Sequence, residues 1–229
     1  MKLVTYEHNG SGQRAGAIAS GGREIVDLLS ANMGVGSSSE NEWYANIQSM
    51  IEGGDEALHT AYDLVKKAPS SARVPYEDVI LHAPVQPPIQ MRDCLCFEGH
   101  LINAFKNARK MRASQSEDPE VAMAEMEQKG ILQVPQTFYE QPIYYKANRF
   151  SVVGHDRDVL WPKHSQLLDF ELEFGCYIGK LALDVPKEKA LDFVYGYTIF
   201  NDFTARDSQI AEMGGQLGPA KGKDFDTGN

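Results

Sequence analysis

The strongest chemical signal in the sequence is the segment 168–174, in which apolar and acidic residues alternate strictly. Successive side chains of a strand point to opposite faces, so Asp169, Glu171 and Glu173 share one face. Three like charges spaced roughly 7 Å apart repel one another unless something compensates them. Mg²⁺ and Ca²⁺ take carboxylate oxygens as ligands, so a divalent cation is an efficient compensator. The alternative is an edge strand with one solvated acidic face.

A second acidic position follows an apolar and aromatic strand predicted over residues 193–200. Asn201 and Asp202 come directly after that strand. A carboxylate at a strand end can point into a site, although an Asp that merely begins a turn is common. Arg206 and Gln209 come shortly afterwards. Such donors beside a metal suit a carboxylate or keto substrate.

A third segment offers Asp93, Glu98 and His100 ahead of a predicted helix. Histidine is the side chain best suited to act as a general base near neutral pH. A structural or surface role is the more common one for any single histidine. Cys94 and Cys96 would suit a soft metal, but a sequence with only three cysteines has no second pair to complete such a site.

These residues need a scaffold, and the pattern predicts short strands with a helical insertion. Residues 42–67 have helical spacing interrupted at Gly53 and Gly54, which predicts two short helices. Asp118 and Pro119 predict the start of a later helix that stops at Gly130. Residues 107–137 are therefore a polar helical insertion, either a surface excursion or a lid over a site. Further predicted elements are strands at 2–7, 14–19, 24–28, 79–81, 143–146, 168–178 and 193–200, and a helix at 101–112.

Composition limits the classes of protein to consider. The chain has 229 residues, 42% of them hydrophobic, which is enough to build a sizeable core and excludes a wholly disordered chain. A net charge of −10 disfavours a nucleic-acid or membrane-surface partner, because both require a basic face. The odd number of cysteines and the absence of a secretion signal predict a reducing, cytoplasmic location.

Four blocks in order resemble the fumarylacetoacetate hydrolase family. The resemblance covers roughly residues 84–229 and implies an α+β, mainly β, fold. The expected architecture is a mixed β-roll or β-sandwich catalytic domain over 84–229 with a helical lid insertion. A small β-rich N-terminal domain with helices, residues 1–83, precedes it. The matching blocks are Asp93 with His100 seven residues later, the Asp-x-Glu-x-Glu strand 169–173, and segments 201–209 and 217–223.

The resemblance also implies roles for individual residues. His100 matches the base that activates water, and Lys223 matches a catalytic lysine. The implied cofactor is a divalent cation, Mg²⁺ first, with Mn²⁺ or Ca²⁺ as alternatives. Lys223 and Thr227 match positions near a second cation. The implied metal ligands are Asp93, Glu171, Glu173 and Asp202, and the implied substrate-binding residues are Arg109, Tyr145, Arg206 and Gln209.

Some positions depart from the family pattern. Leu95 and Met213 stand where tyrosines are expected, so these two positions give no support for fumarylacetoacetate itself as the substrate, whereas the metal-binding positions are retained. The glutamate that orients the catalytic histidine belongs to a C-terminal stretch beyond this sequence, and Glu98 or Glu125 are the candidate substitutes. Because family members continue for several strands past Gly222, we expect a truncated or nicked chain, or one completed by a second polypeptide.

The resemblance implies a metal-dependent hydrolase that cleaves a C–C bond in a β-diketo acid or acylpyruvate-type 2-oxo acid similar to fumarylacetoacetate. Decarboxylation, dehydration or isomerisation of a 2-oxo acid is the nearest alternative. A non-catalytic or fragmentary member that only binds metal or oxo acid is the alternative of another class. The expected partners are a small 2-oxo acid substrate and a second copy of the chain in a homodimer, with no nucleic acid and no membrane.

Overall fold

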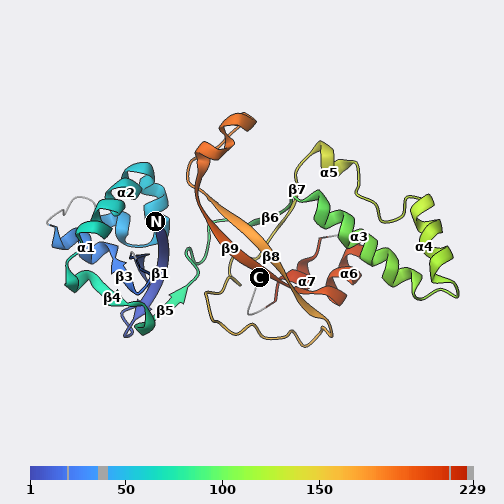
Figure 1. Ribbon diagram of the computed structural model, residues 1–229, viewed down its shortest axis with the longest axis horizontal. Helices are drawn as coiled ribbons and strands as arrows, with labels where there is room; N and C mark the ends of the chain where they lie inside the picture. The colour runs from blue at the N-terminus through green and yellow to red at the C-terminus, as the bar shows by residue number, and fades with distance from the viewer. Residues whose placement is uncertain (20, 36–40, 217, 226–229) are drawn as a thin grey trace. The chain divides into compact units, whose positions relative to one another are not determined.

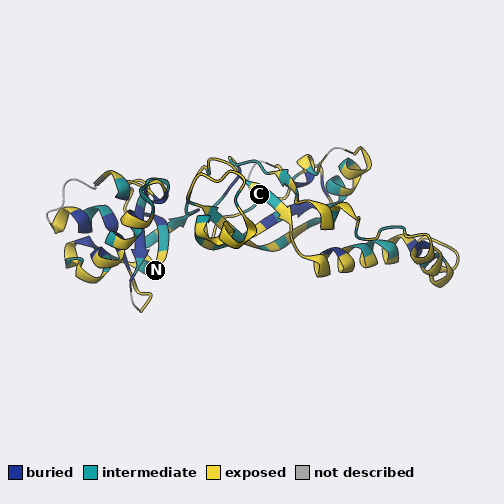
Figure 2. Cartoon of the chain, turned by 90° about the horizontal axis from the view of Figure 1, so that it is seen from above, coloured by how far each residue is buried: buried dark blue, intermediate teal, exposed yellow. Residues whose placement is uncertain are grey.

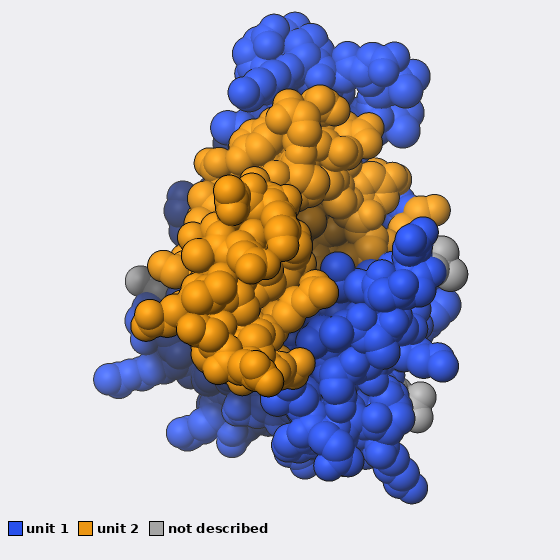
Figure 3. Space-filling view, turned by 90° about the vertical axis from the view of Figure 1, so that its right-hand side faces the viewer, with its two compact units in different colours: residues 1–90, 147–229 blue, residues 91–146 orange. Residues whose placement is uncertain are grey.

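A computed structural model describes residues 1–19, 21–35, 41–216 and 218–225. The chain divides into two compact units, Met1–Gln90 with Ala147–Asn229, and Met91–Lys146 (Figure 3). About 40% of the chain is helical and 25% is strand, so the fold is mixed α/β. The expectation of a mainly β chain is wrong, because three long helices outweigh the many short strands. The predicted domain boundary near residue 84 stays a prediction.

The N-terminal part of the first unit is a five-stranded antiparallel sheet with the order β4-β3-β2-β1-β5. The four strands predicted in this part of the chain are confirmed within about one residue. Residues Arg73–Pro75, which are not among the predicted strands, add a three-residue edge strand, a position where proline is tolerated. The strands are β1 Lys2–His8, β2 Arg14–Ile18, β3 Glu24–Asp27, β4 Arg73–Pro75 and β5 Val79–His82.

Helices cover this sheet and complete its core (Figure 1). α1 spans Leu28–Gly34 and α2 spans Ile47–Lys67. Gly54 interrupts α2 with a φ of 62°, a left-handed conformation that glycine adopts without steric cost, so two helical pieces form as predicted. Short 3₁₀ turns lie at Asn41–Tyr44, Ser70–Ala72 and Tyr76–Asp78. The buried core, dark blue in Figure 2, includes Val26, Leu28, Ala31, Tyr44, Met50, Ala61 and Leu64.

One buried carboxylate, Asp27, joins this sheet to α1. Its Oδ1 accepts the backbone N–H of Ser30 at 2.7 Å and so caps the helix. Arg14 Nε and the Tyr6 hydroxyl both donate to its Oδ2, each at 2.5 Å. Burial alone would raise the pKa of Asp27, but these donors outweigh it, and the pKa lies below its ordinary value. Tyr6, which would otherwise lose its proton near pH 10, has its pKa raised by the same burial.

The second sheet of this unit is a long two-stranded antiparallel ribbon, β8 Leu168–Ile178 with β9 Val194–Ala205 (Figure 1). β8 has the predicted bounds. β9 continues five residues past its predicted end, so Asn201 and Asp202 lie inside the strand and the expectation of a strand-end carboxylate is wrong. A 3₁₀ segment, Lys187–Phe193, precedes β9, and α6 Arg206–Gly214 and α7 Ala220–Lys223 follow it.

The second unit contains the predicted helical insertion. β6 Arg92–Leu95 pairs with β7 Ile143–Lys146, and α3 Glu98–Ala113, α4 Pro119–Gln128 and α5 Thr137–Glu140 lie between them. Asp118 caps α4 by accepting two backbone N–H groups at 3.1 Å, and Gly130 follows its end with a φ of 66°. Both helix signals are thus confirmed, whereas a lid function stays a prediction. Among the described residues, no helix is long and apolar enough to cross a bilayer.

Candidate metal centre

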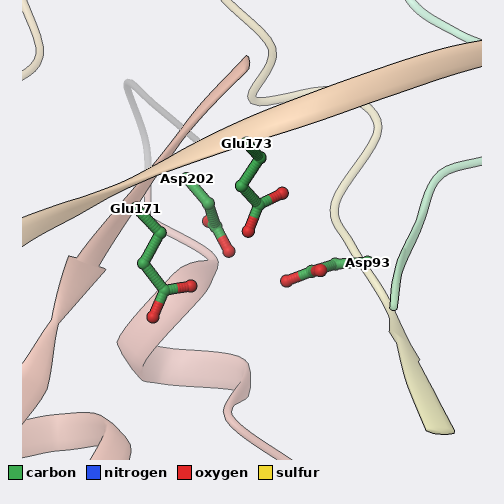
Figure 4. Close-up of side chains that lie close together, drawn as sticks. All are labelled: Asp93, Glu171, Glu173 and Asp202. Carbon is green, nitrogen blue, oxygen red and sulfur yellow. The ribbon is translucent and has the colours of Figure 1, made fainter. Parts of the chain in front are cut away.

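Three carboxylates gather on one face of the β8–β9 ribbon. The register places Glu171 directly opposite Asp202, and Glu173 lies two residues further along β8. Directly opposed residues project to the same face, as do residues two apart. Each of the three side chains offers an oxygen, and these oxygens lie within 4.8 Å of one another (Figure 4). The alternation that predicted a shared face for Glu171 and Glu173 is therefore confirmed, and β9 adds Asp202 to it.

The like charges of Glu171 and Asp202 face each other across the two strands, an arrangement that is destabilising unless it is compensated. Lys223 supplies the compensation. Its Nζ donates to Glu171 Oε2 at 2.6 Å and to Asp202 Oδ2 at 2.5 Å. The Lys223 side chain is 3% exposed and that of Asp202 is 1% exposed, so water screens this contact weakly. A buried lysine is tolerated because it is paired in this way.

Arg206, at the start of α6, makes the second set of ion pairs on this face. Its Nε donates to Asp169 Oδ2 at 2.9 Å, and its Nη1 donates to Glu171 Oε1 at 2.5 Å and to Gln209 Oε1 at 3.1 Å. The structure thus brings Arg206 and Gln209, both predicted substrate contacts, to the acidic face. Asp169 was predicted to share this face but was not among the predicted metal ligands, and it is the second carboxylate partner of Arg206.

These contacts set the protonation of the acidic face. Burial would raise the pKa of Glu171, but Lys223 and Arg206 outweigh it and hold the pKa below its ordinary value. The pKa of Asp169 is also lowered, because its hydrogen bonds, including that from Arg206, prevail over partial burial. Arg206 itself has a raised pKa, since its two carboxylate partners outweigh its own desolvation. Glu171 and Asp169 are thus ionised at neutral pH and able to attract a cation.

Close packing of α7 against α6 positions Lys223. A Cβ on Gly222 would lie 2.8 Å from the backbone nitrogen of Gln209, so this approach requires glycine. The Gly222 N–H also donates to Glu212 Oε2 at 3.1 Å. Asp207 fixes the start of α6 by accepting from Ser165 Oγ at 2.6 Å and from the backbone N–H of Gln166 at 2.7 Å. α6 and α7 therefore hold the basic side chains of Arg206 and Lys223 against the ribbon.

The remaining predicted site residues belong to the other unit. Asp93 on β6 lies directly opposite Tyr145 on β7, so these two predicted residues share one face of that hairpin. His100 lies exposed in the first turn of α3. The assignments of Asp93 as a fourth ligand, Tyr145 as a substrate contact and His100 as the base stay predictions.

Arg109, the other predicted substrate contact, makes contacts within its own unit. Its Nη1 donates to the carbonyl of Leu132 at 2.5 Å, and its Nη2 lies 3.6 Å from Glu127. These contacts connect α3 to the chain around the end of α4. A substrate role for Arg109 is not tested by this geometry and stays a prediction.

The two candidate orienters of His100 have other partners. Glu98 accepts the hydroxyl of Tyr139 at 2.5 Å, and Glu125 pairs with Lys129 at 2.8 Å. Thr227, predicted to lie near a second cation, falls outside the described residues. A role for Glu98 or Glu125 in orienting His100 stays a prediction.

The donor set on the ribbon suits a hard divalent cation. Three carboxylates from two adjacent strands supply oxygen ligands only, which is the chemistry that Mg²⁺, Mn²⁺ and Ca²⁺ prefer over softer metals. None of the three cysteines belongs to this group of residues, and all three are exposed. The geometry thus supports a divalent metal site, without distinguishing among these ions.

Comparison with known proteins is consistent with this site. Residues 102–229 match the family described as "Fumarylacetoacetate (FAA) hydrolase C-terminal". An uncharacterized protein of Archaeoglobus fulgidus is 40% identical over 88 residues, 38% of this chain and 34% of that protein. An oxaloacetate tautomerase of Xenopus laevis is 38% identical over 88 residues, 38% of this chain and 27% of the relative. The matches thus span about a third or less of these relatives' length.

Solved structures show the same fold. A fumarylacetoacetate hydrolase of Exiguobacterium antarcticum has a TM-score of 0.59 at 20% identity, covering 99% of this chain and 62% of that one. Maleylpyruvate hydrolase of Sphingobium sp. SYK-6, solved with manganese(II) and pyruvate, has a TM-score of 0.53 at 17% identity over 90% of this chain and 60% of that one. Because the family match covers more than half of the sequence, this chain belongs to the fumarylacetoacetate hydrolase family.

Proposed function

We propose that this protein is a divalent-metal-dependent hydrolase that cleaves a C–C bond in an acylpyruvate-type 2-oxo acid. The observation that carries the proposal is the group of three carboxylates, Glu171, Glu173 and Asp202, on one face of the β8–β9 ribbon. Asp93 is the proposed fourth ligand. When bound, the cation acts as a Lewis acid that polarises the oxo group of the substrate.

The protein's own side chains have separate tasks in this proposal. His100 removes a proton from the attacking water, and its exposure on the first turn of α3 leaves the imidazole accessible. Arg206 and Lys223 supply positive charge beside the carboxylates, where an anionic substrate group and the negative charge that develops during cleavage need stabilisation. Tyr145, Arg109 and Gln209 are the proposed additional substrate contacts.

The relatives support a small 2-oxo acid as the substrate class. The maleylpyruvate hydrolase structure holds manganese(II) and pyruvate, a 2-oxo acid that acylpyruvate hydrolysis releases. Mg²⁺ is the proposed physiological ion, with Mn²⁺ as the convenient probe. The family resemblance also implies a homodimer, and sedimentation equilibrium of the purified chain tests that proposal directly.

The central experiment separates metal binding from turnover. Glu173→Gln removes one ligand charge and should weaken Mn²⁺ binding at least tenfold in isothermal titration calorimetry. His100→Ala should leave Mn²⁺ binding unchanged while reducing acylpyruvate cleavage by a factor of about 10² to 10⁴. Glu117→Gln, at an exposed position in the second unit, is the matched control and should change neither quantity. Full turnover by both the Glu173 and the His100 variants would refute the assignment.

A tautomerase or isomerase is the second candidate, favoured by the 38% identity to an oxaloacetate tautomerase. Tautomerisation moves a proton and incorporates no water oxygen into a product, whereas hydrolysis adds one oxygen to the carboxylic acid that is released. Turnover in ¹⁸O-water followed by mass spectrometry distinguishes the two. Label in the carboxylate of a released acid supports hydrolysis, and an isomeric product with no acid released supports the second candidate.

A further inference from the structure

Both oxygens of one proposed metal ligand already accept from basic side chains. Glu171 Oε2 accepts from Lys223 at 2.6 Å, and Glu171 Oε1 accepts from Arg206 at 2.5 Å. Lys223 also donates to Asp202 at 2.5 Å, so its single ammonium bridges two of the three carboxylates. The ammonium therefore contacts the oxygens that a divalent cation would require.

The burial of this bridge makes its charge effective. The side chains of Lys223 and Asp202 are almost completely buried, and that of Glu171 is largely buried. Two positive charges that share the same carboxylates in a weakly screened environment repel each other. A divalent cation must therefore displace the ammonium or bind beside it, and either process opposes binding.

We propose that Lys223 is a built-in counter-cation of the metal site: it stabilises the carboxylate pair when no ion is bound and weakens the affinity for the divalent ion that binds there. This inference rests on the proposed function, because it takes Glu171 and Asp202 as metal ligands. Lys223 acts here through those carboxylates and is a positioning residue in this role. Without Lys223, the metal-free site would contain two carboxylates that repel each other. With Lys223, the site remains assembled when no metal is bound.

The chain supplies a matched control on the same short helix. Lys221 is exposed in α7, two residues before Lys223, so Lys221→Met makes the same chemical change without touching the carboxylates. Lys223→Arg keeps the positive charge and tests whether charge, and not the lysine shape alone, sets the affinity. Mn²⁺ is the probe, with the free ion measured by electron paramagnetic resonance and the protein's melting temperature recorded in parallel.

Lys223→Met is expected to bind Mn²⁺ at least tenfold more tightly than the wild type, whereas Lys221→Met and Lys223→Arg show no such tightening. In chelator, Lys223→Met should melt at a lower temperature than the wild type, and saturating Mn²⁺ should restore more of its stability than it adds to the wild type. If Lys223→Met is unfolded in chelator, recovery of its far-ultraviolet circular dichroism on adding Mn²⁺ supports the inference.

Unchanged or weaker Mn²⁺ binding by a folded Lys223→Met variant overturns the inference, as does a variant that stays unfolded in saturating Mn²⁺. Either result leaves the proposed function intact, provided that the wild type binds Mn²⁺ and Glu173→Gln binds it more weakly. A wild type that binds no Mn²⁺ instead refutes the metal site, and the inference about Lys223 falls with it.

Discussion

The N-terminal sheet and the β8–β9 ribbon treat their apolar side chains in opposite ways. In the sheet, the adjacent residues Ile25 and Val26 of β3 point to opposite faces, and both are 0% exposed. In the ribbon, Phe170, Leu172 and Phe174 are 59%, 72% and 67% exposed, while Glu171 and Glu173 on the other face are partly buried. Apolar side chains are therefore buried in the sheet, whereas on the alternating ribbon the apolar face is exposed and the charged face is the more buried one.

The comparison shows that a pattern defines two faces but does not choose which one is covered. Burial of apolar area stabilises the sheet, because α1 and α2 pack against it. On the ribbon, ion pairs from α6 and α7 cover the acidic face instead. Charged groups packed this way need partners, and Lys223 and Arg206 provide them. The ribbon is therefore organised around electrostatic compensation, and the sheet around hydrophobic packing.

Truncation of one aliphatic side chain in each region tests this contrast most strongly. Ile25→Ala should lower the free energy of unfolding of the N-terminal part by about 2–5 kcal/mol, because it leaves a cavity. Leu172→Ala should change the free energy of unfolding of the ribbon by less than about 0.5 kcal/mol, because this side chain is already exposed in the native structure. Urea unfolding followed by far-ultraviolet circular dichroism, which reports on both regions, measures both. Equal losses from the two changes would remove the contrast.

Asp27 tests whether the sheet region also depends on a buried charge. Its lowered pKa means that its contribution to stability is present above about pH 4, the ordinary value for an aspartate, and is lost as the pH falls through the lower folded-state pKa. Asp27→Asn should cost about 1.5–3 kcal/mol at pH 7, since it weakens hydrogen bonds to a charged group. It should also flatten the decline in stability below pH 4. A parallel decline in both proteins during acid titration would contradict this role.

Gly222 tests the contribution of α7 to the ribbon. Gly222→Ala places a methyl group against the backbone of Gln209 and should cost about 1–3 kcal/mol by overpacking. Gly196→Ala, within β9, meets no atom within 4 Å and is the matched control, for which we expect no comparable loss. Thermal melts of the two variants measure the difference. Equal melting temperatures would show that the approach of α7 to α6 is not tight.

Removal of the Tyr195 hydroxyl should have the smallest effect on the free energy of unfolding, and it should raise that free energy where the other changes lower it. It lies on β9 and packs against the N-terminal core, where burial raises the pKa of its phenol to about 12. Its hydroxyl is buried with no hydrogen-bond partner among residues 1–19, 21–35, 41–216 and 218–225. Tyr195→Phe should therefore stabilise the protein by up to about 1 kcal/mol.

Tyr44→Phe is the matched control for Tyr195→Phe. The Tyr44 hydroxyl donates to the carbonyl of Ala57 at 3.2 Å, so its removal should destabilise the protein by about 1 kcal/mol. Urea unfolding compares the two variants. A loss of stability in the Tyr195 variant would mean that its hydroxyl has a partner.

Much of the local structure was predictable because its signals are local. The bounds of β8, the Asp118 cap, the stop at Gly130 and the break at Gly54 all follow from backbone preferences of neighbouring residues. The end of β9 was predicted wrongly, because Asn and Asp are typical of turns. In the structure, Asn201 and Asp202 continue the strand because they pair with β8. Edge strand β4 was not predicted, because its three residues are too few to carry a recognisable strand pattern.

The sequence by itself determined that Glu171 and Glu173 share a face, because the period of a strand is fixed by covalent geometry. Together with the order of its motifs, it also identified the family and a candidate ligand set. Only the tertiary structure decided that Asp202 stands opposite Glu171 and that Lys223 joins the two. Strand register and the approach of α7 depend on residues far apart in the chain. A sequence pattern can therefore predict that charges need compensation, but not which group provides it.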